Sequence, residues 1–129
     1  MRGIVLAHAD LAAALVRAVE QISGVADALT PISNEGLPPE ELHQNLEALT
    51  GGRPVIIFAD LASGSCAFAS RVVQRGRGNV AVVTGASLPM LLDFVFHREM
   101  PLEQLVPKLV KEAQASITAH LNADRPVSG

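Results

Sequence analysis

The segment PVIIFADLASGS, residues 54–65, decides which fold this sequence predicts. Its apolar run, residues 55–59, follows a proline and ends at a carboxylate, and a loop of small residues comes next. An uninterrupted apolar run that is rich in β-branched residues is typical of a parallel strand buried on both faces. The segment therefore predicts a central strand that ends at Asp60 and a loop over residues 61–65.

Outward from this strand, short apolar runs alternate with segments of helical period. We expect further strands at residues 3–7, 28–32 and 79–84, and helices at residues 10–24, 38–49, 66–75, 89–94 and 102–121. This alternation is typical of an α/β protein. The sequence predicts a doubly wound, mostly parallel sheet of four to five strands, in the order 2-1-3-4, with helices on both faces.

Apolar spacing predicts which helix residues face inward. The expected sets are Leu11, Ala14, Leu15, Ala18, Val19 and Ile22 in the first helix, Phe68, Val72 and Val73 in the third, and Leu105, Leu109, Ala113 and Ile117 in the last. With 129 residues, the chain is expected to form a single domain over residues 1–121, followed by a polar tail at residues 122–129.

Composition narrows the classes of function. No apolar run approaches the roughly 20 residues of a membrane span, and the first one, residues 4–7, is too short for a signal peptide. We therefore expect a cytoplasmic protein without membrane insertion. A net charge of -3 without a basic cluster argues against nucleic acid as a partner. The lone Cys66 excludes an intramolecular disulfide and is interpreted as a small buried side chain.

The predicted strand order places a candidate site. In an open parallel sheet, ligands bind beyond the carboxyl ends of the strands, where the order reverses. In the order 2-1-3-4 that point lies between the first and third strands, which end at His8 and Asp60. A carboxylate bonded to one ring nitrogen fixes the histidine tautomer and leaves the other nitrogen free as a nucleophile. Ser63, Gly64 and Ser65 meet a helix start there, which suits a bound phosphoryl group.

Simpler roles exist for several of these residues. Considered alone, Asp60 is explained slightly better as a cap of the following loop or helix than as a catalytic residue. An isolated histidine at a strand end often has a structural role. The pairing of the two is what favours a catalytic site. His43, His97 and His120 are expected to lie on the surface or to cap helices.

Several segments also resemble the mannose-type IIA family of sugar phosphotransferase systems. They are GIVLAH (residues 3–8), FADLASGS (58–65), ASRVV (69–73) and TGASLPML (84–91). The resemblance implies that His8 accepts a phosphoryl group from the carrier HPr and passes it to a IIB protein, that Asp60 orients His8, and that Ser65 contacts the phosphate. It also implies a homodimer. Such a phosphotransferase needs only positioning and charge stabilisation, so no cofactor and no metal are expected.

Two stretches depart from the family pattern. Members often have glycine after the histidine, whereas Ala9 and Asp10 follow His8 here. Asp10 is expected either to cap the following helix or to repel an incoming phosphoryl group. Where members usually have two glycines and then Ser-Pro, this chain has residues 63–66, SGSC.

Other functions remain open at this point. One is a regulatory phosphoprotein of the same fold that is not coupled to transport, and another is the related subunit of dihydroxyacetone kinase. A receiver domain phosphorylated on Asp60 would also explain Thr84, but receivers bind Mg²⁺ with an acidic pair where this chain has Ala7, His8 and Ala9. A hydrolase based on Ser65 lacks the expected nucleophile motif.

Overall fold

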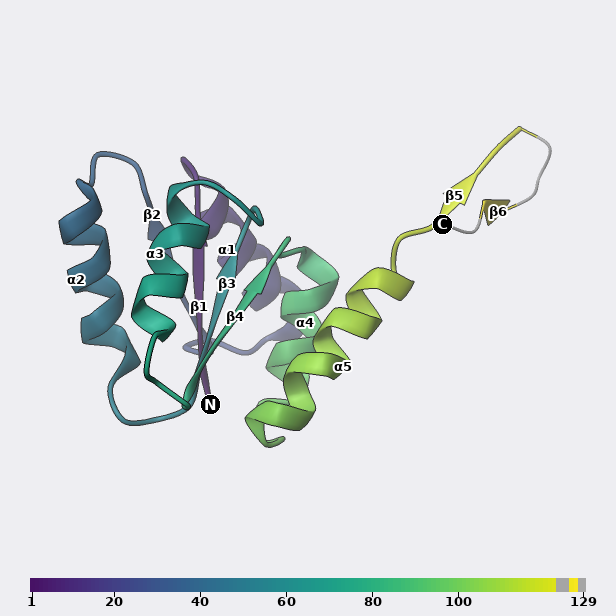
Figure 1. Cartoon of the computed structure of the whole chain (residues 1–129). Helices are drawn as coiled ribbons and strands as arrows, with labels where there is room; N and C mark the ends of the chain where they lie inside the picture. Colours follow the sequence, from purple (N-terminus) through teal and green to yellow (C-terminus); the bar gives the residue numbers. More distant parts are fainter. Residues whose placement is uncertain (123–125, 128–129) are drawn as a thin grey trace.

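The computed structural model describes residues 1–122 and 126–127. Its elements, shown in Figure 1, are β1 (Arg2–Ala7), α1 (Leu11–Ser23), β2 (Leu29–Ser33), α2 (Pro39–Thr50), β3 (Val55–Ala59), α3 (Ser65–Gln74), β4 (Val80–Thr84), α4 (Leu88–Phe96), α5 (Leu102–Ala115), β5 (Ala119–His120) and β6 (Pro126–Val127). None of the helices in these described residues is long and apolar enough to cross a membrane.

Four parallel strands form the main sheet in the order β2-β1-β3-β4, which confirms the predicted fold. In this register Gly3 lies between Leu29 of β2 and Ile56 of β3, and Ile57 of β3 pairs with Val82 of β4. The order reverses between β1 and β3, so the carboxyl ends of these two strands flank the switch point.

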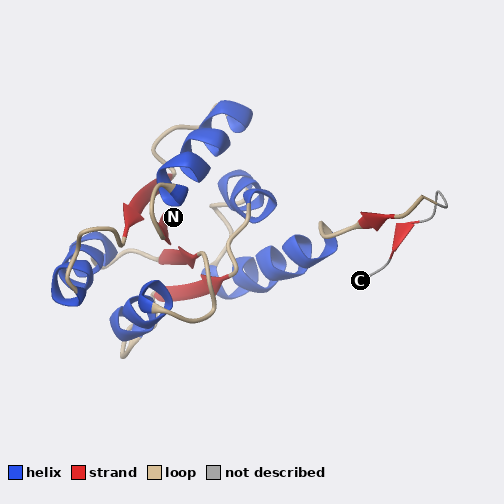
Figure 2. Ribbon diagram, turned by 90° about the horizontal axis from the view of Figure 1, so that it is seen from above, coloured by secondary structure: helices blue, strands red, loops and turns tan. Residues whose placement is uncertain are grey.

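Helices cover both faces of the sheet, as Figure 2 shows from above. On one face, Val5 and Phe58 pack with side chains of α1, α4 and α5, among them Phe94. On the other face, Ile4 and Leu6 pack with residues of α2 and α3. Burial on two sides explains why the central strands are uninterrupted apolar runs instead of alternating patterns.

Gly3 provides a test of this packing. A Cβ atom there would lie 2.7 Å from Leu29 Cδ2 and 2.8 Å from the Phe94 ring, inside the core. Because overpacking a well-packed core costs about 1–3 kcal/mol, we expect Gly3→Ala to lower the free energy of unfolding by that amount. Urea denaturation followed by circular dichroism measures it. Gly52→Ala, whose Cβ meets open space, is the control, and equal stability of the two variants would contradict the packing described here.

The buried face of α1 differs from the predicted one. Leu11 is 43% exposed and Ile22 is 60% exposed, whereas the helix buries Ala12, Val16 and Val19. Of these three buried residues, only Val19 was predicted to face inward. This helix carries apolar residues on most of its sides, so several sets of residues have helical spacing and could face the sheet. The set that includes the small residue Ala12 is the one that does so.

Phe68 of α3 was also predicted to face inward and is 59% exposed. Val73 is buried as predicted, together with Cys66, Ala69 and Ser70. The buried Ser70 hydroxyl donates a hydrogen bond to the Cys66 carbonyl oxygen at 2.8 Å. That bond allows a polar residue in the inward stripe, which the apolar pattern does not reveal.

The last helix ends earlier than predicted, at Ala115 instead of residue 121. Leu105, Leu109 and Ala113 are buried as predicted, but Ile117 is 75% exposed because it lies beyond the helix end. The Ser116 hydroxyl bonds to the Ala113 carbonyl oxygen at 2.6 Å and so competes with the helical pattern.

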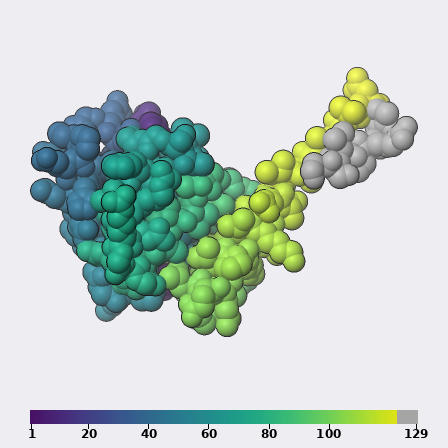
Figure 3. All heavy atoms as spheres, viewed as in Figure 1, coloured from purple at the N-terminus to yellow at the C-terminus, as the bar shows by residue number. Residues whose placement is uncertain are grey.

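Beyond α5 the described residues form two short paired strands instead of further helical turns. β5 and β6 pair antiparallel, with Ala119 opposite Val127, so His120 lies in a strand and not in the last helical turn. Figures 1 and 3 show this arm projecting away from the body of the molecule. Of the predicted tail, residues 123–125 and 128–129 lie outside the described residues.

Candidate functional site

His8 and Asp60 meet at the switch point. The His8 ring Nδ1 lies 2.8 Å from Asp60 Oδ2, and the backbone N–H of His8 donates to the same oxygen at 3.0 Å. The backbone N–H of Asp60 in turn bonds to the Leu6 carbonyl oxygen at 3.3 Å. The end of β1 and the end of β3 therefore hold each other in place, and the strand order brings the two predicted residues together.

This geometry assigns different roles to the two ring nitrogens. With Nδ1–H donated to the carboxylate, the neutral ring carries its free lone pair on Nε2. The His8 side chain is 41% exposed, whereas that of Asp60 is 10% exposed. The buried Asp60 carboxylate holds the ring at Nδ1, and the exposed side of the ring is open to solvent. Both features suit a histidine that acts as a nucleophile.

Asp60 is held in its ionised form. Burial raises its pKa, but the backbone N–H and the ring of His8 together lower it by more, so the pKa lies below the ordinary value of 3.8. Its second oxygen, Oδ1, is buried and has no hydrogen-bond partner among the described residues. The carboxylate is therefore charged at neutral pH and incompletely satisfied.

The depressed pKa predicts a pH effect on stability. A carboxyl group whose pKa is lower in the folded state stabilises the fold above its unfolded value, here about 3.8, and loses that contribution as the pH falls through the folded value. We expect the free energy of unfolding of the wild type to fall more steeply below pH about 4 than that of Asp60→Asn. Urea denaturation at a series of pH values measures both. Parallel curves would contradict an Asp60 that is preferentially ionised in the folded protein.

The loop of residues 63–65 leads into α3 beside this pair. Gly64 adopts a left-handed conformation with φ of 96°, and the helix begins at Ser65. The Ser65 hydroxyl accepts a hydrogen bond from Asn34 Nδ2 at 3.3 Å. No hydrogen bond in the described part of the chain joins Ser63, Gly64 or Ser65 to His8 or Asp60. Their role in binding phosphate stays a prediction.

Asn34 is a site residue that sequence reasoning missed. It follows β2, and its backbone N–H bonds to the Ala7 carbonyl oxygen at 3.2 Å, directly before His8. The strand order contains the clue, because the carboxyl end of β2 lies at the same edge of the sheet as that of β1.

Cys66 was also missed as a neighbour of His8. Its Sγ lies 3.9 Å from His8 Nδ1, and the residue is fully buried, as predicted for a small apolar side chain. Burial and the charge of Asp60 raise the pKa of the thiol. The sequence predicts that the first turn of the helix after β3 lies near the switch point. It does not predict which residue of that turn faces His8, because this depends on the rotation of α3 about its axis.

The turn after His8 explains one departure from the family pattern. Ala9 has φ of 52°, in the left-handed region that favours glycine, at a cost of roughly 1–2 kcal/mol for other residues. Asp10 takes the N-cap position of α1, but its side chain makes no capping hydrogen bond. A side-chain cap, one of the two alternatives for Asp10, is therefore not formed. Its exposed carboxylate stands two residues from His8.

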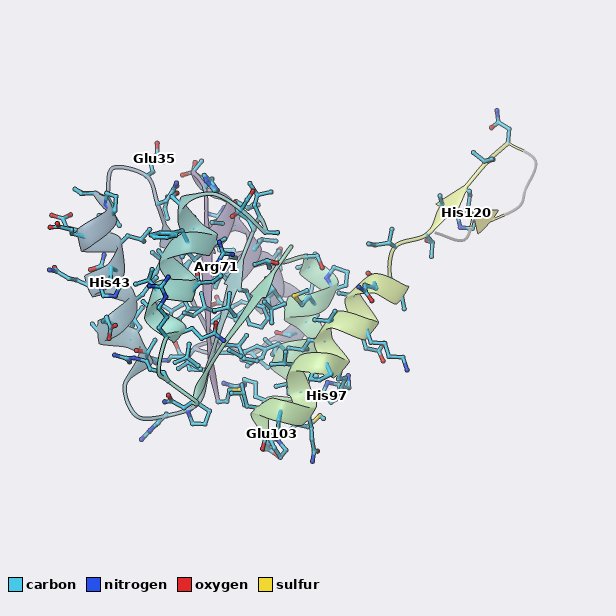
Figure 4. The ribbon with its side chains drawn as sticks, in the orientation of Figure 1. Glu35, His43, Arg71, His97, Glu103 and His120 are labelled. Carbon is cyan, nitrogen blue, oxygen red and sulfur yellow. The ribbon has the colours of Figure 1, made fainter. Side chains whose placement is uncertain are left out.

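His97 and His120 lie apart from this site, whereas His43 lines a cavity together with Asn34 and Ser65. Figure 4 shows His43 on α2, His97 at the lower end of the body and His120 on the projecting arm. His97 caps α4, and its Nδ1 lies 2.9 Å from Asp93 Oδ1. At 42%, its exposure nearly equals that of His8. This second histidine and carboxylate pair is a natural control for the first.

An apolar groove adjoins the site. A cavity of about 290 Å³ lies between α2 and α3 and is lined by Ser65, Leu42 and the exposed Phe68, among others. A larger cavity, about 940 Å³, lies near the amino ends of the strands and contains Arg2, Arg53 and Arg98 but no histidine or cysteine. Because this cavity has no histidine in its lining, the candidate phosphohistidine chemistry stays at the carboxyl edge.

Most of the chain matches a known protein family. Residues 3–114 match the family model EIIA-man, described as "PTS system fructose IIA component". A comparison with curated proteins gave no significant match.

Solved structures show the same fold. The EIIA phosphotransferase component of Streptococcus agalactiae has a TM-score of 0.85 and 20% identity over 92% of this chain and 95% of its own. The mannose/sorbose specific IIA subunit of Enterococcus faecalis has a TM-score of 0.79 and 21% identity over 92% of both chains. A sigma-54 interaction domain protein of Enterococcus faecalis has a TM-score of 0.75 and 13% identity over 89% of this chain and 91% of its own.

Proposed function

The chain belongs to the EIIA-man family of sugar phosphotransferase IIA components, and from this membership we propose that His8 accepts a phosphoryl group from phospho-HPr and passes it to a IIB component. The observation that carries the proposal is the 2.8 Å contact between His8 Nδ1 and Asp60 Oδ2. It leaves Nε2 as the free nucleophile on a half-exposed ring.

The transfer needs one bond made and one broken. Nε2 of neutral His8 attacks phosphorus, the bond between phosphorus and the donor atom of phospho-HPr breaks, and that donor atom keeps the electron pair. His8 then carries a phosphoramidate and a positive ring, which the ionised Asp60 stabilises through Nδ1–H. In the second transfer a nucleophile of IIB attacks phosphorus, and the bond to Nε2 breaks with its electron pair returning to the His8 ring. Phosphoryl transfer depends mainly on such positioning and charge stabilisation.

The phosphoryl oxygens are assigned to the start of α3. Backbone N–H groups at a helix start and a serine hydroxyl are suitable donors for an anion. Cys66 Sγ lies 3.9 Å from the His8 ring, so the first turn of α3 is adjacent to the reacting residue. We therefore assign phosphate binding to Ser63, Gly64 and Ser65.

Ser65→Ala tests this assignment. A hydrogen bond to a charged group contributes about 1.5–3 kcal/mol, so losing one from the transition state is expected to slow transfer by roughly 10- to 100-fold. Single-turnover labelling by phospho-HPr, followed by quenched-flow, measures the rate. Ser116→Ala, far along the chain at the end of α5, is the control. A Ser65→Ala rate equal to that of the wild type would remove Ser65 from the phosphate site.

Protein partners fit the surroundings of His8 better than a free sugar does. The exposed apolar side chains Leu61 and Phe68 belong to the loop and helix that follow Asp60. Exposed apolar residues beside a reactive group are typical of a surface that contacts another protein. This supports phospho-HPr and IIB as donor and acceptor.

We also propose that the protein forms a homodimer, as the family resemblance implies. β4 is an edge strand of the four-stranded sheet, and the arm of β5 and β6 projects from the body. Edge strands and projecting arms are common sites of association between copies. Light scattering is expected to give twice the 13.5 kDa of one chain, and a monomer at working concentration would exclude the dimer.

The experiment that tests the relay uses purified protein with phosphoenolpyruvate, enzyme I and HPr. Intact mass spectrometry is expected to show one acid-labile phosphate, which then moves to an added IIB protein. An unlabelled chain with active upstream proteins would overturn the proposal.

A regulatory role is the second candidate. It is suggested by the fold that this chain shares with a sigma-54 interaction domain protein. Labelling of the chain without transfer to any IIB protein of the same organism would favour regulation.

A further inference from the structure

Three potential metal ligands converge beside His8. His8 Nδ1, a carboxylate oxygen of Asp60 and Cys66 Sγ all lie within 4.8 Å of one another, and within residues 1–122 and 126–127 no other group of three such residues does so. They come from the end of β1, the end of β3 and the first turn of α3. The fold itself, not local sequence, therefore assembles the cluster.

The distances suit a tetrahedral ion. Zn²⁺ with bonds of about 2.0 Å to nitrogen or oxygen and 2.3 Å to sulfur holds its ligand atoms roughly 3.3–3.6 Å apart. Sγ and Nδ1 lie 3.9 Å apart, slightly more than this, and Nδ1 and Oδ2 lie 2.8 Å apart, slightly less. Side-chain shifts of about half an ångström would bring both of these distances into that range, and a fourth position would remain for water.

A second observation points to a cation. The Asp60 side chain is nine-tenths buried, and its Oδ1 has no hydrogen-bond partner among the described residues. A buried carboxylate oxygen without a donor is costly, and a bound cation relieves that cost. The negative charge and the unsatisfied atom lie on the residue that a metal would share with His8 and Cys66.

We propose that His8, Asp60 and Cys66 bind one Zn²⁺ ion, and that this ion switches off the phosphoryl relay. The inhibition of the relay by this ion rests on the proposed function. When Zn²⁺ bonds to Nδ1, the neutral ring carries its proton on Nε2, and the Cys66 thiol releases its proton to solvent. Nε2 then has no free electron pair, so it cannot attack phosphorus. Binding and phosphorylation exclude each other.

Metal binding is tested first, with the full chain after chelator treatment. We expect native mass spectrometry and calorimetry to show one Zn²⁺ per chain. Co²⁺ in its place is expected to show thiolate-to-cobalt absorption. Cys66→Ala should lose that absorption and weaken Zn²⁺ binding by about 100-fold or more, since even changes around the ligands cost 10- to 100-fold. Cys66→Ser, in which serine is close to cysteine in volume, should lose the same absorption, and this separates the loss of the thiolate from a folding defect.

His97→Ala is the matched control, because it removes a histidine of equal exposure that also pairs with a carboxylate. It should bind Zn²⁺ and Co²⁺ like the wild type. Binding that survives both Cys66 variants, or that disappears in His97→Ala, would overturn the site.

The switch is tested by phospho-HPr labelling with and without one equivalent of Zn²⁺. Each variant is compared with its own metal-free rate. The wild type should be inhibited at least 10-fold and recover with chelator, whereas Cys66→Ala should show no inhibition. Zn²⁺ binding without inhibition would overturn the switch alone. If the metal-free wild type is not labelled at all, the relay fails, and the cobalt spectrum still decides the metal site.

Discussion

His8→Ala is expected to eliminate phosphorylation by phospho-HPr, with labelling below the detection limit of intact mass spectrometry. The reason is chemical, since alanine offers no nucleophile and His8 is the histidine that lies at the switch point between β1 and β3. The fold should survive, because the His8 side chain is 41% exposed and contributes little to the core. Circular dichroism and urea denaturation verify this in the same preparation.

His97→Ala is the matched control for that experiment. His97 has almost the same exposure as His8 and a carboxylate at 2.9 Å, but it caps α4 at the other end of the molecule. Full labelling of His97→Ala beside none on His8→Ala would assign the phosphate to one histidine. Labelling that persists in His8→Ala would refute His8 as the acceptor.

Asp60→Asn is expected to slow transfer by about 10²- to 10⁴-fold, in line with the effect of the same substitution in histidine–aspartate pairs of other enzymes. An amide at residue 60 no longer fixes the proton on Nδ1, so the ring also populates the tautomer without a free Nε2. It also cannot stabilise the positive ring that forms with the phosphoramidate. Rapid quench of single-turnover labelling gives the rate.

Asp93→Asn controls for the loss of any carboxylate next to a histidine. Asp93 bonds to His97 and to Lys108 Nζ at 2.6 Å, so its loss affects stability without touching the switch point. Transfer at the wild-type rate in Asp93→Asn and a large loss in Asp60→Asn would localise the effect. A loss of less than about threefold in Asp60→Asn would mean that His8 is positioned by other contacts.

Sequence reasoning reached the strands and their order because their physical cause is local. Val55–Ala59 is apolar throughout since the strand is covered on both faces, and proline or glycine residues separate the elements. Strand order then followed from the handedness of the connections, and it placed His8 and Asp60 side by side.

The buried faces of α1 and α3 could not be predicted from the sequence, because they depend on how each helix is rotated about its axis. α1 has apolar residues on most sides, and α3 buries Ser70 while exposing Phe68, so neither pattern singles out the inward face. The same rotation of α3 decides whether Cys66 or Ser65 points to His8. Side-chain neighbours of this kind follow from tertiary packing, which one sequence does not encode as a periodicity.

The complete burial of residues 4–7 of β1 has a consequence for how the protein unfolds. Ile4, Val5, Leu6 and Ala7 are fully inaccessible and lie between two neighbouring strands, directly before His8. Amides in such a strand exchange with solvent only when the whole molecule opens, in contrast to frayed termini and loops. The backbone that carries His8 therefore belongs to the last cooperative unit to melt. In hydrogen exchange, the amides of residues 4–7 should therefore be the last to exchange, at a rate set by global unfolding.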